Sequence, residues 1–149
     1  VMLDKGSIDG LREGQPVLGA EGLMGQIVMV GQRNSRAVLI TDSAHALPVQ
    51  VNRSGLRAIA EGSGRIDQLV IRHLAATTDI RVGDLLVTSG LGGRFPHGYP
   101  VARVTDVTIS PGDAFAVVNA APSSALDRGR FVLVVARESA DPIQPGSQL

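Results

Sequence analysis

Hydrophobic and polar residues alternate along most of this chain, in short runs that end at Gly, Asn, Asp or Pro. A period of two is typical of β-strands, because successive side chains of a strand point to opposite faces of the sheet. The apolar spacing of a helix, at i, i+3, i+4 and i+7, is almost absent. The sequence therefore predicts an all-β protein, with strands at 2–5, 16–20, 25–30, 36–41, 46–51, 57–61, 67–74, 84–89, 101–109, 114–120 and 131–136.

Composition agrees with this prediction and narrows the range of partners. The 149 residues include 18 Gly and 8 Pro but only 3% aromatic side chains, which suits short strands separated by many turns. A chain of this length can form one compact domain or two small ones. The 14 basic and 14 acidic side chains cancel, so no net field attracts a polyanion. Nucleic-acid binding is therefore not expected.

Cysteine is absent, which excludes disulfides and thiolate metal sites. No apolar run reaches the roughly 20 residues of a membrane span, and no leader-like segment begins the chain. The chain as given is therefore expected to be soluble. Because its first residue is Val, we also expect a fragment from which a targeting segment has been removed.

An internal similarity indicates two related units. The segments 12–15 (REGQ) and 81–84 (RVGD) are alike, and similar glycine and apolar positions follow each of them. A repeat of about half the chain length is typical of two duplicated β units, although two β-hairpins can also resemble each other by chance. The predicted division is a first β-barrel at 1–62, a second at 63–137 and a flexible tail at 138–149, with strands able to exchange across the boundary.

Four residues follow the order of a chymotrypsin-like serine hydrolase: His45 as base, Asp79 or Asp84 as orienting acid, and Ser89 as nucleophile. The local sequence does not fit, because Thr88 stands where Asp precedes the nucleophile in that family, and the glycines that follow are interrupted. We therefore expect Ser89 to be a turn residue. A degenerate or active hydrolase of this type is kept as the alternative function.

The sequence gives still weaker support for an aspartic-protease site or a metal site. Asp42 follows an apolar strand as in aspartic proteases, but Ala44 stands where the supporting turn of those enzymes needs Gly. Asp42 is therefore expected to cap a turn. The histidines His45, His73 and His97 are scattered singly, without a second ligand at suitable spacing. No catalytic residue, metal site or cofactor is predicted.

The segment 89–100 is a long loop that is rich in glycine yet carries three large apolar side chains. It begins like a phosphate-binding loop, but Phe95 stands where close helix packing needs Gly, so no nucleotide site is expected. Such a loop either covers one end of a barrel or contacts a partner. For a partner contact, the predicted residues are Leu91, Phe95 and Tyr99 as anchors, with Gly90, Gly92 and Gly93 allowing close backbone approach.

Four longer segments together carry a family resemblance. They are 4–11 (DKGSIDGL), 22–27 (GLMGQI), 35–42 (SRAVLITD) and 82–101 (VGDLLVTSGLGGRFPHGYPV). In this order they resemble the MreC family of bacterial rod shape-determining proteins, over about residues 1–137. The stretch 83–100 is the most specific, because general β-composition does not produce such a string.

The resemblance implies two small six-stranded-type β-barrels, arranged as in chymotrypsin-like proteases but without their triad. It also implies a non-catalytic scaffold of cell-wall elongation that maintains rod shape from the periplasmic side of the cytoplasmic membrane. An N-terminal helix, absent from this sequence, would anchor it there. The implied partners are the protein itself, the class B penicillin-binding transpeptidase of elongation and the membrane protein MreD.

Overall fold

The computed structural model describes residues 1–91, 95–109, 112, 114–126 and 133–134. Each segment predicted from alternation contains a strand, which confirms the all-β fold. The strands are β1 (Met2–Leu3), β2 (Pro16–Gly19), β3 (Gly22–Val30), β4 (Ser35–Leu39), β5 (Ala46–Val51), β6 (Arg57–Gly62), β7 (Leu69–Ala75), β8 (Leu85–Thr88), β9 (Pro100–Ile109), β10 (Phe115–Pro122) and β11 (Leu133–Val134). A short 3-10 helix, η1 (Ser7–Asp9), follows β1.

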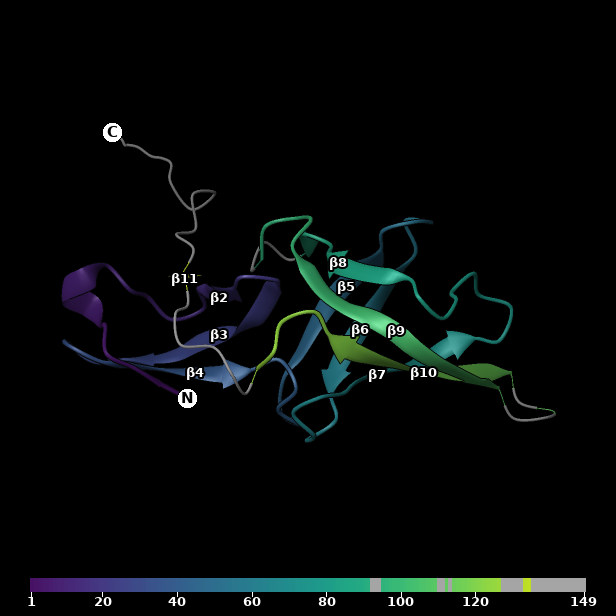
Figure 1. Ribbon diagram of the computed structural model, residues 1–149, viewed down its shortest axis with the longest axis horizontal. Helices are drawn as coiled ribbons and strands as arrows, with labels where there is room; N and C mark the ends of the chain where they lie inside the picture. The colour runs from purple at the N-terminus through teal and green to yellow at the C-terminus, as the bar shows by residue number, and fades with distance from the viewer. Residues whose placement is uncertain (92–94, 110–111, 113, 127–132, 135–149) are drawn as a thin grey trace.

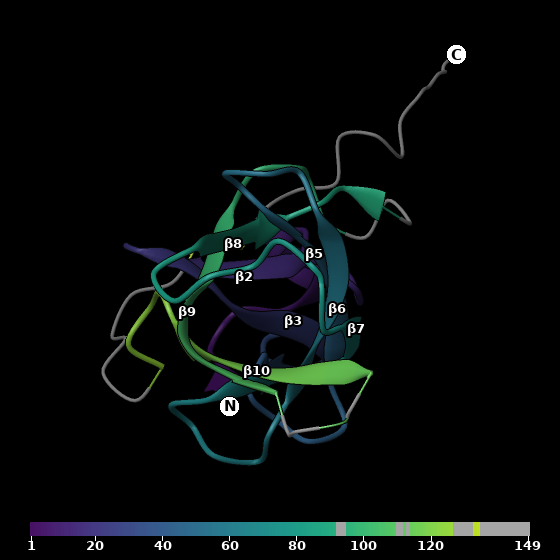
Figure 2. The ribbon, with the colours of Figure 1, turned by 90° about the vertical axis from the view of Figure 1, so that its right-hand side faces the viewer.

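The strands form two units that lie side by side along the long axis of the molecule (Figure 1). One is a closed barrel of six strands in the order β10-β7-β6-β5-β8-β9, seen from its far end in Figure 2. The other is a five-stranded sheet in the order β1-β4-β3-β2-β11. All neighbouring strands are antiparallel. The sequence predicts two barrels. The structure has two β units, one of them a closed barrel and the other, over the residues described, a five-stranded sheet.

The chain passes from the sheet to the barrel earlier than the predicted boundary at residue 62. β5 and β6 lie before that boundary, yet they pair with β8 and β7 of the barrel. The pairing therefore changes in the segment 40–45, between β4 and β5. In the other direction, β11 leaves the barrel region and pairs with β2 of the sheet. The expected flexible tail, 138–149, lies outside the described residues.

Strands β2, β3 and β4 of the sheet repeat the pattern of β8, β9 and β10 of the barrel. In each copy a bulge interrupts the pairing of the first two strands, and a second bulge interrupts that of the last two. The bulges fall at matching positions, and the register is the same on both sides of them. Equivalent pairs are Val17–Gly25 and Leu86–Ala102, Ile27–Ala37 and Val104–Ala120, and Met29–Arg36 and Asp106–Asn119.

The correspondence extends to the flanking strands. β1 pairs with β4 as β7 pairs with β10, and β11 pairs with β2 as β5 pairs with β8. The equivalent pairs are Leu3–Ser35 and Ile71–Val118, and Leu133–Leu18 and Gln50–Val87. In the barrel, β6 joins β5 to β7 and closes the ring, whereas no described strand takes its place in the sheet. Such agreement over five strands supports a true internal repeat rather than a chance similarity of two hairpins.

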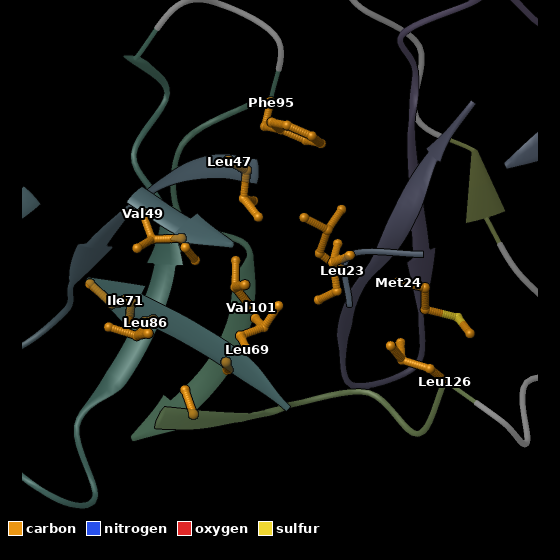
Figure 3. Close-up of a cluster of buried hydrophobic side chains, with 14 of the residues drawn as sticks. Leu23, Met24, Leu47, Val49, Leu69, Ile71, Leu86, Phe95, Val101 and Leu126 are labelled. Carbon is orange, nitrogen blue, oxygen red and sulfur yellow. The ribbon is translucent and has the colours of Figure 1, made fainter. Parts of the chain in front are cut away.

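One hydrophobic core continues from the barrel into the sheet. Leu23 of β3 lies beside Val101 and Leu69 of the barrel, and Met24 lies beside Leu126 (Figure 3). All five side chains are buried. Burial of a Leu or Val side chain stabilises a fold by about 1.5–3 kcal/mol, so these contacts hold the two units together.

The connection between β2 and β3 is also fixed against the barrel. The hydroxyl of Ser124 donates a buried hydrogen bond of 2.9 Å to the carbonyl oxygen of Gly22. At Gly22, φ is +150°, and a Cβ atom would lie 2.5 Å from the carbonyl oxygen of Pro100. Only glycine fits so close to the first residue of β9. The sheet therefore meets the barrel through both apolar packing and a specific polar contact.

Candidate functional site

Thr88 holds the C-terminal half of the loop between β8 and β9, the predicted contact site. The backbone N–H of Tyr99 donates to the Thr88 hydroxyl oxygen at 2.9 Å, and that hydroxyl donates to the carbonyl oxygen of Pro96. The N–H of Gly98 donates to the Thr88 carbonyl oxygen at 2.8 Å. These bonds turn the C-terminal half of the loop back onto β8.

The loop residues predicted as anchors lie in different environments. Phe95 is only 3% exposed and belongs to the core, so its predicted role as a surface anchor is wrong. Its ring meets the edge of the His45 ring, with centroids 6.4 Å apart, and covers one end of the barrel core (Figure 3). Leu91 is 53% exposed, and Tyr99 and Gly90 are half-buried. Gly92 and Gly93 lie outside the described residues.

His45 connects this loop to the sheet. Its Nε2 atom lies 3.2 Å from Oε1 of Gln26 on β3, and both side chains are buried. The amide nitrogen of Gln26 donates in turn to the carbonyl oxygen of Gly14 at 3.2 Å. His45 therefore takes part in a polar chain that crosses from the barrel to the sheet.

The acids considered for a hydrolase are bound to Arg53. Its guanidinium contacts Asp84 through Nε and Nη2, both at 2.9 Å, and contacts Asp79 through Nη1 at 3.0 Å. Asp84 is buried and also accepts the backbone N–H of Arg81 at 2.8 Å. The hydrogen bonds from Arg53 lower the pKa of both carboxyl groups. Both acids thus remain charged and hold the turn before β8 against the turn between β5 and β6.

The remaining protease-like residues also make local backbone contacts. The Ser89 hydroxyl oxygen accepts the N–H of Leu91 at 3.2 Å, as expected for a turn residue. Asp42 accepts the N–H of Ala44 at 2.8 Å, which is the predicted capping of a turn. Both side chains therefore stabilise the turns that follow a strand, β4 for Asp42 and β8 for Ser89.

Two negative findings apply to the described part of the chain. Its His, Asp and Glu side chains form no group of three that could hold a metal ion. It also contains no helix long and apolar enough to cross a membrane.

Large exposed apolar side chains gather in two places that the sequence did not indicate. On the five-stranded sheet, β1 and β3 present Met2, Val28 and Met29, exposed by 63%, 44% and 57%. We call these three residues the sheet patch. Around the β9–β10 connection, a second set is exposed by 40% to 56%. We call it the hairpin patch; its members are Phe115 and Val117 on the outer face of β10, and Ile109 on the other face of the hairpin, opposite Ala116.

A cavity of about 670 Å³ borders the sheet patch. Its lining includes Val28 and Arg36 of the sheet, together with Asp42, Ala44 and Ile66. Arg36 itself lies between the two methionines, because it is the pairing partner of Met2 on β1 and of Met29 on β3. The sheet patch is therefore a mixed surface with an arginine at its centre and a hollow beside it.

Comparison with known proteins now identifies the family. The family described as rod shape-determining protein MreC, barrel core, matches residues 1–136. The chain belongs to the MreC family. It is 51% identical to the cell shape-determining protein MreC of Escherichia coli (strain K12), over 97% of this chain and 40% of that protein. The crystal structure of MreC from Pseudomonas aeruginosa is 56% identical, with a TM-score of 0.87 over 91% of this chain and 87% of the other.

The chain spans only about two fifths of the length of the Escherichia coli MreC. A solved structure of the major periplasmic domain of the cell shape-determining filament MreC is 26% identical, with a TM-score of 0.67 over 83% of this chain and 77% of that one. A complex between penicillin-binding protein PBP2 and MreC from Helicobacter pylori is 20% identical and shares the fold, with a TM-score of 0.58 over 75% of this chain and 69% of that one.

Proposed function

We propose that this MreC chain is a non-catalytic periplasmic scaffold of cell-wall elongation, which maintains rod shape by binding other proteins. The observation that carries the proposal is a contrast between two groups of residues. The acids that would serve a hydrolase are committed to Arg53, whereas large apolar side chains remain exposed on the sheet, the hairpin and the β8–β9 loop. Exposed apolar surface of this kind is typical of protein interfaces.

The first proposed partner is the class B penicillin-binding transpeptidase of elongation. A family member from Helicobacter pylori has been solved in complex with penicillin-binding protein PBP2, which makes a protein of this class the first candidate. We assign the contact to the β8–β9 loop, where Leu91 is exposed and Tyr99 is half-buried, while Phe95 supports the loop from below. A contact with MreD is proposed on family membership alone.

The second proposed partner is another copy of the chain. A related structure is that of a cell shape-determining filament, and this chain exposes two separate apolar patches. A chain with two different binding surfaces can associate head to tail without closing into a ring.

Binding of the transpeptidase can be tested with the soluble domain of that enzyme and this chain, by isothermal titration calorimetry. We expect Leu91→Asp to weaken binding at least tenfold, because a charge replaces an exposed apolar contact. Val82→Glu is the matched control. Val82 is also exposed, by 65%, and the first repeat already has Glu13 at the equivalent position of the turn. Unchanged affinity of Leu91→Asp would place the contact elsewhere, and no binding by the wild type would contradict the proposed partner.

A further inference from the structure

The internal repeat shows which surface residues the fold itself requires. Both copies share strand register and bulges, so a side chain needed by the backbone should have the same character in both. On the barrel, the outer positions of β9 and β10 hold Asp106 and Asn119, which pair with each other. Thr108 donates a hydrogen bond of 3.0 Å to Asp106. At these positions the outer face of the barrel is thus polar.

The same positions on the sheet are largely apolar. Met29 corresponds to Asp106, and Val28 corresponds to the bulged residue Thr105. Both Met29 and Val28 are exposed, so neither contributes a side chain to the core. Because the barrel builds the same bulge with polar residues, the fold does not require apolar ones here. The sheet patch is therefore better explained by contact with another protein.

The hairpin patch is equally specific to one copy. β9 and β10 continue beyond the part that matches β3 and β4, and this extension carries Ile109 and Phe115. In the first copy, the position that corresponds to Val117 is Asn34, in the polar turn between β3 and β4, and the extension that carries Ile109 and Phe115 has no counterpart. The Phe115 ring makes an edge contact with the ring of exposed His73, with centroids 6.3 Å apart, and remains 56% exposed.

The two patches lie toward opposite ends of the molecule. The β3–β4 turn is at one end of the long axis and the β9–β10 connection at the other (Figure 1). Met29 is the last residue but one of β3, while Ile109 and Phe115 flank the β9–β10 connection. A single chain can therefore offer one patch to a copy ahead of it and the other patch to a copy behind it.

Their charges are complementary as well. Arg36, at the centre of the sheet patch, is exposed and makes no ion pair with any residue that the structure describes. Asp106 lies on the same outer face as Val117, two pairs further along β9 and β10, and its described partners are the neutral side chains of Thr108 and Asn119. Each patch thus has an unpaired charge of opposite sign beside its apolar side chains.

We infer that the hairpin patch of one MreC copy binds the sheet patch of the next, with Asp106 opposite Arg36. This inference rests on the self-association proposed above and assigns its two surfaces. The contact is heterologous, because two different surfaces meet, and it leaves a free patch at each end of a dimer. Repetition of the contact therefore gives an open chain of copies.

The repeat also supplies substitutions that the backbone tolerates. Val28→Thr with Met29→Asp copies the second repeat into the first and removes the sheet patch. Phe115→Asp removes the centre of the hairpin patch, and Val82→Glu is the control outside both patches. Circular dichroism and thermal unfolding should show that every variant keeps the wild-type fold. Should Phe115→Asp unfold, Val117→Asn replaces it, since Asn34 holds the equivalent position in the first copy.

The decisive measurement is sedimentation velocity over a concentration series. We expect the wild type and Val82→Glu to grow in size with concentration, and each patch variant to stay monomeric. An equimolar mixture of the two patch variants should form a dimer and nothing larger, because the mixture retains one intact sheet patch and one intact hairpin patch. This complementation is particular to a heterologous contact.

The outcomes separate this inference from the function it rests on. If the wild type associates and the patch variants do so equally, the assigned surfaces are wrong while self-association stands. If one variant alone still dimerises and the mixture gives no new complex, the contact joins two like patches, and the inference fails. If the wild type is monomeric at every concentration, both the inference and proposed self-association are overturned, whereas transpeptidase binding is judged by its own titration.

Discussion

Gly14 and Gly83 occupy the same place in two copies of one turn. The N–H of Gly14 donates to the carbonyl oxygen of Ile27 at 2.8 Å, and that of Gly83 donates to Val104 at the same distance. Their φ angles are +91° and +93°. The side chains that follow them act alike, since Gln15 and Asp84 each accept the N–H of the residue three positions earlier, at 2.9 Å and 2.8 Å. The short similarity visible in the sequence thus marks the turn that leads into β2 in one copy and into β8 in the other.

The turn predicts the effect of Gly83→Ala. The left-handed conformation costs an L-residue about 1–2 kcal/mol, and a Cβ atom at Gly83 would meet nothing within 4 Å. The free energy of unfolding should therefore fall by about that amount through backbone strain alone. Urea denaturation measures it, with Val82→Ala as the control. A loss well above this range would mean that the turn is packed more tightly than the structure shows.

The ion pair of Arg53 and Asp84 predicts a dependence of stability on pH. Hydrogen bonds from Arg53 lower the pKa of buried Asp84 in the folded protein. A lowered pKa contributes stability above the unfolded value of about 4, and this contribution is lost as the pH falls through the folded pKa. Asp84→Asn should cost about 1–3 kcal/mol at pH 7, as for hydrogen bonds to charged groups.

The same variant should also unfold with a weaker pH dependence than the wild type below pH 4. Urea denaturation at pH 7, 4 and 3 compares the two proteins. Asp67→Asn is a suitable control, because Asp67 forms only an exposed ion pair with Arg65. Parallel pH profiles for wild type and Asp84→Asn would show that Asp84 is not the group responsible.

Ser89→Ala separates a scaffold from a hydrolase. The Ser89 hydroxyl oxygen accepts one local N–H, so its removal should change the free energy of unfolding by only about 1 kcal/mol. Rod shape should be restored when a longer MreC with this substitution replaces the wild type in cells. Loss of rod shape by a variant that folds normally would favour the hydrolase instead.

Phe95→Ala distinguishes a core residue from a surface anchor. Phe95 is buried against His45, so truncation should leave a cavity and cost about 3–5 kcal/mol. Leu91→Ala, in the same loop but exposed, should change stability by less than about 0.5 kcal/mol. Thermal unfolding compares the two. Equal effects would contradict the burial of Phe95.

The sequence predicts the strands well because alternation is local. The sequence does not predict that β5 and β6 belong to the closed barrel, because strand pairing joins residues far apart in the chain. No local pattern shows, for example, that Val49 pairs with Thr88. The sequence leaves the place of Phe95 open, because a glycine-rich loop can either expose or bury an aromatic ring. The sheet patch arises only when β4 brings Met2 and Met29 to either side of Arg36.

Ser124→Ala tests whether the sheet and the barrel unfold together. The Ser124 hydroxyl binds the Gly22 carbonyl oxygen across the junction of the two units, in a buried position. Its removal leaves that oxygen without this donor, which should cost about 1–3 kcal/mol, whereas Ser123→Ala should have little effect because Ser123 makes its described contact through the backbone N–H. Since Leu23 and Val101 share one core, we expect a single transition with the same midpoint by circular dichroism and by hydrogen exchange of both units. Two separate transitions in the wild type would mean that the contacts across the junction are too weak to make the two units unfold together. Ser124→Ala would then move the two midpoints further apart.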